Sequence, residues 1–384
     1  MIDLCRARLR SNPRFELIPH DRLEASQSNQ FGPLNEDPDF FGILLPPSGS
    51  KLPAKAVSRD AALLLLALGQ AACLPHLLTR LLGPDANDRL RQLILDGVLE
   101  VEVDGGFVSG PAAIGLLGGP GQSIPTSRVA QLSWAAIDYA EAMESLDLNE
   151  LASRLYLFNA APSTPQLQQR FAGDQQLLDF LFEADTTARR IRAHWRRQPI
   201  KHSWLTWVNE QASAAAAPYK LYVSPTLGDL PAVFAAAVES FTQAHCKQFK
   251  LGRGAYGVLR PDKLVAFFVE LDQLQRAAEL MRASTSGAGV QGVPFSAPVD
   301  ADGLMSWGMD PPRFEQTLAV GEQQSWRQWL TERIAVYTVA ARQAGVSARA
   351  FVRERIALDG VDCSNWAPDL AIWSGPAETA QEVA

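Results

Sequence analysis

The sequence predicts an α+β protein with more than one domain. Of its 384 residues, 47% are hydrophobic and 20% are charged, so the chain can bury a sizeable core and is long enough for two or three domains. Residues 218–269 have the pattern strand, helix, strand, strand, and residues 40–110 have two strands, three helices and a hairpin. Both segments combine the alternating pattern of strands with the 3.6-residue pattern of helices, which favours the α+β class.

Residues 1–39 are expected to form a polar N-terminal arm. Within it, Ser26–Gln30 predicts a loop or a loosely ordered segment. The first residues, MIDLCRARLRSNPRF, lack the apolar stretch of a secretion signal. Ala61–Leu68 is apolar but much shorter than the roughly 20 residues that span a bilayer. We therefore expect a cytoplasmic protein without a membrane segment.

Residues 40–110 are expected to form a small winged-helix-like module. The pattern consists of two strands, three helices and a hairpin whose turn is Asp104-Gly105-Gly106. Ser58 is placed to cap the first helix. The predicted segments are strands over 41–45 and 52–57, helices over 58–68, 74–82 and 85–96, and the hairpin over 98–108.

This module, from GILLPPSGSKLPAKAVSRDAALLLLALGQ through LRQLILDGVLEVE, resembles the small peptide-recognition domain of ribosomal-peptide pathways. In that family a leader peptide adds a strand to the sheet beside the third helix. The resemblance implies a precursor peptide as partner, together with other modifying enzymes of the pathway. A DNA-binding winged helix is disfavoured, because the third helix mixes basic and acidic residues: Arg89, Arg91, Asp85, Asp88 and Asp96. A purely structural role stays open.

Residues 111–200 are expected to be a linker followed by a helical connector. Gly110–Pro125 is rich in glycine, but it lacks the Gly-Lys-Ser/Thr ending of a phosphate-binding P-loop. Trp195, Trp204 and Trp207 are expected to pack, although one of them exposed over a groove could hold a peptide side chain. Helices are predicted over 128–143, 148–158 and 174–195.

Residues 201–374 are expected to form a mixed sheet with flanking helices, followed by a disordered tail over 375–384. A helix is predicted between the first two of three strands, which cover 219–224, 249–251 and 264–269. Lys220 on the first strand and Lys250 on the second could share one face of the sheet, since side chains alternate and neighbouring strands lie about 5 Å apart. Two such cations attract an anion, and Arg260 at the turn into the third strand could join them.

Three short motifs follow one another between Pro218 and Pro312: K-L-Y-V-S (Lys220–Ser224), Q-F-K (Gln248–Lys250) and R-P-D-K-L-V-A-F-F (Arg260–Phe268). Together they resemble the phosphothreonine lyase fold of bacterial type III effectors and the related lyase domains of lanthipeptide and other ribosomal-peptide biosynthesis. In that family a lysine takes the α-proton of a phosphorylated Ser or Thr. A histidine protonates the departing phosphate, and arginines and a further lysine neutralise its charge.

Position by position, the resemblance implies that Lys250 is the base, Lys220 a phosphate-side lysine and Arg260 a phosphate arginine. Three other expected groups, an acid, a lysine and an arginine, are replaced by Tyr222, Gln248 and Gly308. If the protein is active, the resemblance therefore makes Tyr222 the group that stands where the acid is needed.

Two further residues are expected to contact the peptide or its phosphate. Trp307 lies in Leu304–Gly308, which resembles the late strand whose arginine clamps phosphate in the family. Arg253 lies in Gly252–Gly257, which matches G-x-G-x-x-G but is followed by Pro261 and a strand instead of the helix of a dinucleotide site. These glycines are expected to form a flexible rim over the two lysines.

Three functions stay open at this point. Tyrosine has an ordinary pKa of about 10, a poorer match to neutral pH than imidazole, and two cations of the family pattern are missing. The favoured function is therefore a precursor-peptide-binding protein on a catalytically degenerate lyase-like fold. The alternative is an active lyase that eliminates phosphate from phospho-Ser or phospho-Thr of such a peptide, for which His245 could supply an acid. A structural subunit of an assembly is the third.

The composition disfavours several other classes. The formal net charge is -7, which argues against a nucleic-acid partner because binding a phosphate backbone needs a cationic surface. The four cysteines are widely separated and form no CxxC pair, so neither a disulfide framework nor a zinc site is expected. The sequence predicts no metal and no cofactor.

Overall fold

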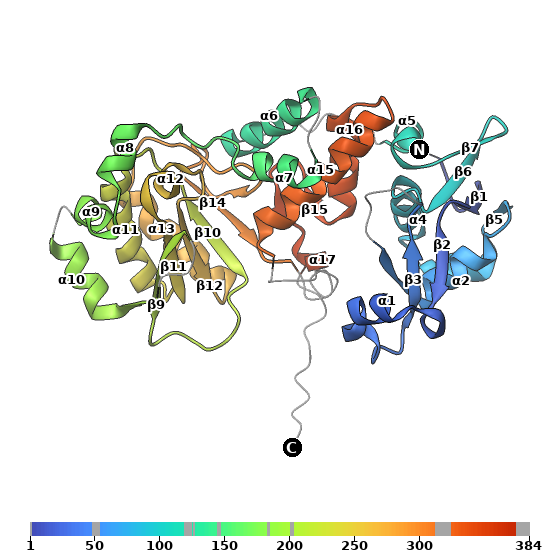
Figure 1. Ribbon diagram of the computed structural model, residues 1–384, viewed down its shortest axis with the longest axis horizontal. Coiled ribbons are helices and arrows are strands. Elements are labelled where there is room, and N and C mark those ends of the chain that lie inside the picture. The colour runs from blue at the N-terminus through green and yellow to red at the C-terminus, as the bar shows by residue number, and fades with distance from the viewer. Residues whose placement is uncertain are drawn as a thin grey trace, which may run out of the picture. The chain divides into compact units, whose positions relative to one another are not determined.

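The computed structural model describes residues 2–47, 54–118, 125, 127–143, 147–182, 185–199, 203–311 and 324–373. The chain divides into two compact units (Figure 1). The first consists of Met1–Gln122, Pro312–Gln324 and Val336–Asp359, and the second of Ser123–Pro311, Ser325–Ala335 and Gly360–Ala384. Antiparallel sheets and helices occur in both units, which confirms the α+β class. The tail expected over 375–384 lies outside the described residues.

The first unit contains two antiparallel sheets and a set of short helices. The sheets have the strand orders β5-β1-β6-β7 and β2-β3-β4. The strands are β1 (Arg8–Ser11), β2 (Glu16–Pro19), β3 (Phe40–Leu45), β4 (Lys55–Ser58), β5 (Ala72–Cys73), β6 (Leu99–Val103) and β7 (Gly106–Val108). The helices are α1 (Ala25–Gln30), α2 (Arg59–Ala67), α3 (His76–Leu82), α4 (Ala86–Leu95), α5 (Ile114–Leu117) and α16 (Ala348–Leu358).

Most of the local structure predicted for residues 40–110 is confirmed. The Ser58 hydroxyl accepts a hydrogen bond from the Ala61 N–H and so caps α2. Asp104 and Gly105 have φ angles of 49° and 81°, the left-handed conformation that a two-residue hairpin turn requires. Part of the predicted second strand, residues 52–53, lies outside the described residues.

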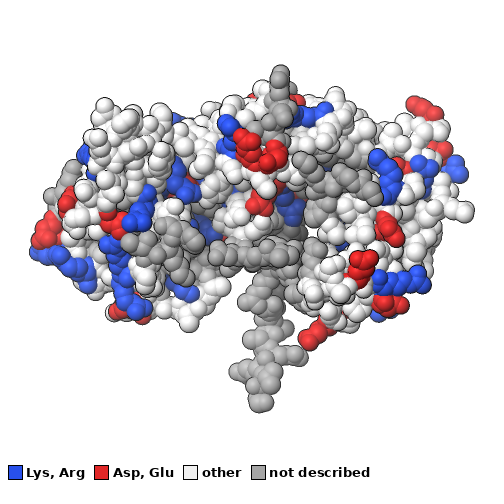
Figure 2. Space-filling view, viewed as in Figure 1, with Lys and Arg blue, Asp and Glu red and all other residues white. Residues whose placement is uncertain are grey.

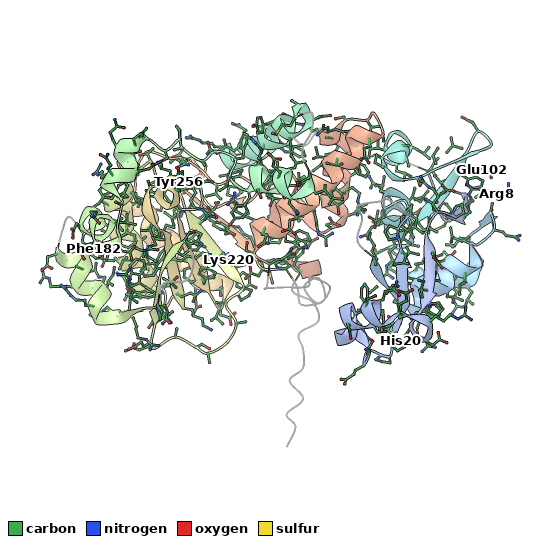
Figure 3. All side chains as sticks on the ribbon, in the orientation of Figure 1. Arg8, His20, Glu102, Phe182, Lys220 and Tyr256 are labelled. Carbon is green, nitrogen blue, oxygen red and sulfur yellow. The ribbon has the colours of Figure 1, made fainter. Side chains whose placement is uncertain are left out.

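The polar first segment is more regular than the sequence indicated. Residues 26–30, expected as a loop, belong to α1, which begins with a capping box between Glu24 and Gln27. The segment also contains β1, whose Leu9 pairs with Val101 of β6, and an ion pair of 3.1 Å joins Arg8 to Glu102 on the same two strands (Figure 3). The expectation of a loop over 26–30 was wrong because the polar composition concealed the local capping box of α1, whereas β1 was not predicted because its partner strands lie far along the chain.

The second unit is built on a sheet with the order β13-β14-β10-β12-β11-β9-β8. Every pairing between its described strands is antiparallel, so the expected mixed sheet was wrong in this respect. The strands are β8 (Trp195–Arg197), β9 (Trp204–Asn209), β10 (Tyr219–Val223), β11 (Gln248–Gly252), β12 (Leu264–Phe268), β13 (Ala297–Pro298) and β14 (Met305–Met309). A separate pair is formed by β15 (Val361–Asp362) and β16 (Ala367–Pro368).

Helices surround this sheet (Figure 1). Before it in the chain come α6 (Arg128–Ala142), α7 (Leu148–Tyr156), α8 (Pro165–Arg170), α9 (Asp174–Leu181) and α10 (Asp185–His194). Between and after its strands come α11 (Leu230–Gln243), α12 (Gly254–Leu259), α13 (Leu271–Ser284), α15 (Trp326–Gln343) and α17 (Leu370–Trp373). The part of α15 from Val336 onward belongs to the first unit. The single helix expected over 174–195 is divided into α9 and α10, and residues 183–184 lie outside the described residues.

One face of the sheet packs against α11 and α13 and forms the main hydrophobic core. Leu221 of β10 and Phe249 of β11 point into this core and are fully buried. Trp195 and Trp207 belong to the same core, as expected, whereas Trp204 does not. Because side chains alternate along a strand, the residues on either side of Leu221 and Phe249 face the opposite surface of the sheet.

The glycine-rich segment after β11 differs from its prediction. Gly252–Gly257, expected as a flexible rim, contains the start of the short helix α12. A Cβ on Gly252 would lie 2.2 Å from the carbonyl oxygen of Gly257, so the absence of side chains lets the end of β11 pack directly against α12. The glycines therefore serve close packing.

Candidate functional site

The sheet face opposite the core carries Lys220 and Tyr222 from β10 and Lys250 from β11. Lys220 is labelled within the sheet in Figure 3. Strand β12 lies between β10 and β11. The expectation that the two lysines lie on neighbouring strands was therefore wrong. Phe267 of β12 lies opposite Lys220, and each lysine ammonium is 5.3 Å from the centroid of its ring. The three sequence-predicted groups therefore share one face, with an aromatic ring between the two cations.

Lys250 has no hydrogen bond or ion pair with any described residue. Its ammonium lies 4.2 Å from the centroid of Trp204, which stands on the site face of β9 and not in the core. Burial lowers the pKa of Lys250, and the positive charge of Lys220 adds to this effect, so that the pKa falls to about 8. Lys250 is thus a cation that loses its proton far more readily than an ordinary lysine.

Lys220, in contrast, is buried in an ion pair with Asp310. Burial raises the pKa of Asp310, and the charge of Lys220 opposes that rise. The Asp310 carboxylate also accepts a hydrogen bond of 3.3 Å from the backbone N–H of Trp326. This pair fixes the Lys220 ammonium beside the ring of Phe267 and partly neutralises its charge.

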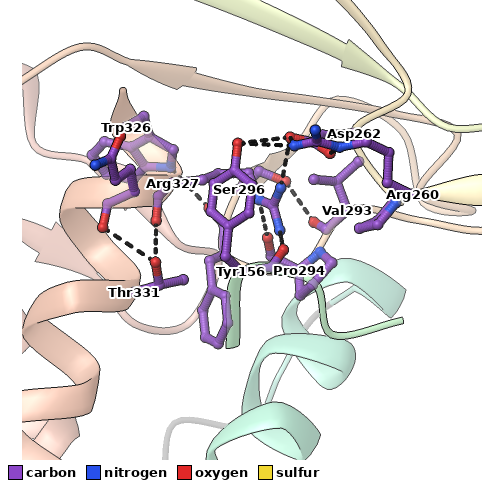
Figure 4. Close-up of polar contacts among 12 residues, drawn as sticks. Tyr156, Arg260, Asp262, Val293, Pro294, Ser296, Trp326, Arg327 and Thr331 are labelled. Atoms are coloured by element: carbon purple, nitrogen blue, oxygen red, sulfur yellow. Dashed lines mark hydrogen bonds and ion pairs between the residues drawn. The ribbon is translucent and has the colours of Figure 1, made fainter. Parts of the chain in front are cut away.

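Arg260 is held by Asp262 and Tyr156 (Figure 4). Its Nε and Nη2 donate to the two carboxylate oxygens of Asp262 at 2.6 and 3.0 Å, and the Tyr156 hydroxyl donates to the same carboxylate at 2.9 Å. The Arg260 guanidinium carbon is 4.5 Å from the centroid of Trp204, so Arg260 and Lys250 contact the same indole ring. The Nη1 group of Arg260 makes no hydrogen bond to a described residue, which leaves it available to an anion.

A second arginine, Arg327 of α15, completes the cluster in Figure 4. Its Nη1 lies 3.0 Å from Asp262, its Nε donates to the Pro294 carbonyl, and its Nη2 donates to the Tyr156 carbonyl. Burial alone would raise the pKa of Asp262, but Arg327 and Arg260 lower it to about 2. Asp262 is therefore a permanent carboxylate that orients two guanidinium groups.

Tyr222 lies on the site face of β10 and is almost fully buried. Burial raises the pKa of its hydroxyl well above the ordinary value, although the charge of Arg327 acts in the opposite direction. Its hydroxyl makes no hydrogen bond to a described residue. Tyr222 therefore stays a neutral phenol that carries a proton to donate, but the raised pKa makes it a weaker acid than an ordinary tyrosine.

The structure does not bring the other expected residues to this face. Trp307 pairs with the core residue Leu221 and lines a different cavity beside α13. Arg253 forms an ion pair of 2.6 Å with Asp174 outside the lysine face. His245 is exposed after the last turn of α11, with a φ of 55°. These placements correct the expectation that Arg253 and Trp307 contact the peptide or its phosphate together with the two lysines.

Gly308 lies opposite Lys220 on β14, where the sequence resemblance expects an arginine. A Cβ at this position would lie 2.4 Å from the Trp326 indole. The indole N–H of Trp326 donates to the Phe295 carbonyl at 2.9 Å, so the ring is held in place. The space for the missing arginine is occupied by tryptophan.

Sequence reasoning missed Asp262, Asp310, Arg327, Tyr156 and the role of Trp204. Asp262 carried a local signal, because it stands two residues after Arg260 in the R-P-D motif. Trp307 could have been excluded by alternation, since its neighbour Gly308 was assigned to the site and two adjacent strand residues face opposite ways. Nothing in the sequence near the lysines points to Arg327, which follows them by a long stretch of chain.

Three further observations concern metal sites, membrane helices and surface charge. No group of His, Cys, Asp and Glu that could hold a metal ion occurs among the described residues. In the same part of the chain, no helix is both long and apolar enough to cross a membrane. On the face drawn in Figure 2, the coloured Lys and Arg side chains are interspersed with Asp and Glu. The arrangement brings together a lysine of lowered pKa, a neutral phenol and a guanidinium fixed by a carboxylate.

Comparison with known proteins gives distant structural likenesses. No family model and no curated protein matches the sequence. An effector protein from Pseudomonas syringae pv. tomato has 12% identity, a TM-score of 0.41 and coverage of 63% of this chain and 99% of that one. The phosphothreonine lyase SpvC, an effector from Salmonella, has 13% identity, a TM-score of 0.27 and coverage of 52% and 96%. Both TM-scores are low.

Proposed function

We propose that this protein is a lyase that eliminates phosphate from a phosphorylated Ser or Thr of a peptide, with Lys250 as the base. The observation that carries the proposal is the state of Lys250: its pKa is lowered to about 8, and it has no ion-pair partner among the described residues. A general base works best when its pKa is near the operating pH. Perturbed pKa values of this kind cluster at catalytic sites.

The spacing of base and acid fits this reaction. Lys250 and Tyr222 lie on the same row of the sheet, since both are opposite Val265. One strand therefore separates them, which corresponds to about 10 Å between their backbones. The Val265 side chain lies between them, so the Cα, Cβ and leaving oxygen of a substrate residue would have to bind over it.

In the proposed step, the neutral Lys250 amine takes the α-proton. The electron pair of the C–H bond forms the Cα=Cβ double bond, and the Cβ–O bond breaks with its electrons passing to the phosphate. The Tyr222 phenol gives its proton to the leaving oxygen, and Arg260 Nη1 stabilises the phosphate charge. The products are a dehydrated residue and inorganic phosphate, and solvent then returns a proton from Lys250 to Tyr222. No oxidant or reductant is consumed.

The first unit supports a peptide as the substrate. In the sheet β2-β3-β4, β4 has one edge that pairs with no other described strand. An extended peptide binds such an edge through backbone hydrogen bonds. Together with the resemblance of this segment to a precursor-peptide recognition element, this edge supports a leader peptide as partner. Another enzyme of the same pathway would have to phosphorylate the peptide first.

A second candidate function is peptide binding without catalysis. It is favoured by the two buried carboxylates, since Asp262 and Asp310 neutralise cations that a phosphate dianion would need. Gly308 replaces the expected arginine, and Trp326 fills the space beside it. The site therefore lacks one more cation for a phosphate, which also favours binding without catalysis. On this second proposal the sheet face with Lys220 and Lys250 holds an unmodified precursor peptide for other enzymes.

One experiment separates the two. The full chain is incubated with phospho-Ser and phospho-Thr peptides, and mass spectrometry and a phosphate assay follow the loss of phosphoric acid. The lyase proposal expects turnover that falls at least about 100-fold in Lys250→Ala, the usual contribution of a general base. Lys247→Ala is the matched control, because Lys247 donates only to backbone carbonyls away from the site. Saturable binding without any elimination would leave the second candidate and overturn the first.

A further inference from the structure

Gln248 lies on the sheet face that carries Lys220 and Lys250, two residues before Lys250 on β11. It stands opposite Phe267 of β12 and Val208 of β9. The Gln248 side chain is partly exposed, and its amide makes no hydrogen bond to a described residue. Gln248 therefore has N–H donors available beside the proposed base.

The proposed elimination develops a negative charge on the carbonyl oxygen of the reacting residue. Removal of the α-proton beside an amide places the charge there, and a positioned N–H donor stabilises it. Tyr222 and Arg260 act on the leaving phosphate instead. Lys220 is committed to its ion pair with Asp310. The carbonyl oxygen therefore needs a different donor close to Lys250.

Gln248 and the arginine proposed for the phosphate lie on opposite sides of Lys250 along β11. The Arg260 guanidinium carbon is 4.5 Å from the centroid of Trp204, whose strand partner Gly252 stands two residues after Lys250. Gln248 stands two residues before it. In a phosphorylated Ser or Thr, the carbonyl and the arm that carries the phosphate are separate substituents of Cα. A residue with its α-proton at Lys250 and its phosphate toward Arg260 can therefore turn its carbonyl toward Gln248.

Thr206 is the other polar neighbour of Lys250 on this face. It lies opposite Lys250 on β9, and its hydroxyl also makes no hydrogen bond to a described residue. The hydroxyl of a threonine is attached to Cβ and stays near the sheet, whereas the amide of a glutamine stands farther out. The Lys250 ammonium is at the end of a four-carbon stem, beside the Trp204 ring. Gln248 thus matches the height of the base better than Thr206 does.

We propose that Gln248 is a further catalytic residue, whose side-chain amide donates a hydrogen bond to the carbonyl oxygen of the reacting residue while Lys250 takes the α-proton. The proposal rests on the proposed lyase function. The electron pair of the C–H bond is held as an enolate, and it forms the Cα=Cβ double bond when the Cβ–O bond breaks and the carbonyl is restored. Gln248 keeps its proton throughout, so the balance of the reaction is unchanged. Because the amide is neutral, it adds no second positive charge beside Lys250.

The first test removes the donor. Gln248→Met keeps the length of the side chain, and we expect kcat on a phosphopeptide to fall about 100-fold or more, the usual cost of one lost donor to a developing oxyanion. KM should change little, because the hydrogen bond strengthens only as the charge develops. Gln243→Met is the matched control, because Gln243 is exposed on α11, on the other side of the sheet, and bonds only to Glu239. Thermal unfolding checks that both variants fold.

The second test changes the acceptor. A phosphopeptide with a thioamide sulfur in place of the carbonyl oxygen of the reacting residue offers a weaker hydrogen-bond acceptor and a more acidic α-proton. Gln248→Met should therefore lower kcat by about 100-fold on the amide peptide but by about tenfold or less on the thioamide peptide. A glutamine that only supports the fold would give equal losses on the two peptides, and this result would overturn the proposal.

The outcomes separate this proposal from the lyase proposal. If the unmodified protein turns over no phosphopeptide, both proposals fall. Turnover that is lost in Lys250→Ala but kept in Gln248→Met would leave the lyase standing and overturn the role of Gln248. Thr206→Val removes the competing hydroxyl at nearly constant shape. A loss of kcat in that variant, with none in Gln248→Met, would assign the donor to Thr206 and would also overturn the proposal.

Discussion

Lys220 and Lys250 lie on either side of the Phe267 ring, and each ammonium nitrogen is 5.3 Å from its centroid. Their surroundings nevertheless differ. Lys220 is paired with Asp310, whereas Lys250 meets only aromatic rings among the described residues. A partly buried ammonium without a paired counter-ion loses its proton at lower pH, which is why the lyase proposal assigns the base to Lys250 and not to Lys220.

The pH dependence of turnover follows from Lys250. Its pKa is about 8, and only the neutral amine can take a proton, so kcat/KM should rise with pH up to about 8 and then level off. Burial keeps Tyr222 protonated over this range, so no fall is expected below about pH 10. The measurement is kcat/KM between pH 6 and 9.5 on one phosphopeptide. A rate that falls over this range would contradict the assignment of Lys250.

Replacing the acid tests the second half of the step. Tyr222→Phe removes one hydroxyl from a residue that is already buried, so the fold should persist. We expect kcat to fall by about 100-fold to 10,000-fold, the range for a lost general acid, while the Kd of the peptide changes little. Kd is measured with the unphosphorylated peptide. Turnover within a few-fold of the unmodified protein would show that another group protonates the phosphate.

Asp262→Asn tests the arginine cluster through stability. Arg327 is almost fully buried and would lose the carboxylate that balances its charge. Breaking a buried ion pair from one side costs about 3–5 kcal/mol of unfolding free energy, which urea denaturation measures. The matched control is Asp302→Asn at an exposed position, for which we expect a change below about 0.5 kcal/mol. Equal effects of the two substitutions would mean that Asp262 does not hold the cluster together.

Lys263 predicts a pH dependence of stability. It is fully buried and donates to the Pro225 carbonyl and to Gln291, and burial lowers its pKa to about 7 while Asp262 acts in the opposite direction. The unfolded chain, with a lysine pKa of about 10.4, binds more protons between these two values. The contribution of Lys263 to the unfolding free energy therefore rises with pH from about 7 to about 10.

Lys263→Met removes this titration. Urea denaturation at several pH values should give a smaller increase of the unfolding free energy between pH 7 and 9 for the variant than for the unmodified protein. The lost hydrogen bonds lower the stability of the variant at every pH, so only the difference in slope is diagnostic. Parallel pH profiles would show that Lys263 keeps an ordinary pKa.

Much of the local structure could be predicted from the sequence. The Ser58 cap, the Asp104-Gly105 turn and the strands that carry Lys220 and Lys250 were all recognised. These features depend on residues a few positions apart, whose conformational preferences act within one turn or strand. The α+β class follows from the same local patterns.

The composition of the site was decided by tertiary structure. Alternation along β10 already gave Lys220 and Tyr222 a common face, and the register of β10 and β11 on β12 placed Lys250 on that same face. Only the pairing of strands placed Phe267 between the lysines, and only the packing of α15 brought Arg327 to Asp262. Burial, counter-ions and neighbouring charge set the pKa of a side chain, and each of these comes from residues distant in the chain. For that reason the resemblance of the sequence pointed to Lys250 as a candidate base, while the folded structure determined which cations are neutralised.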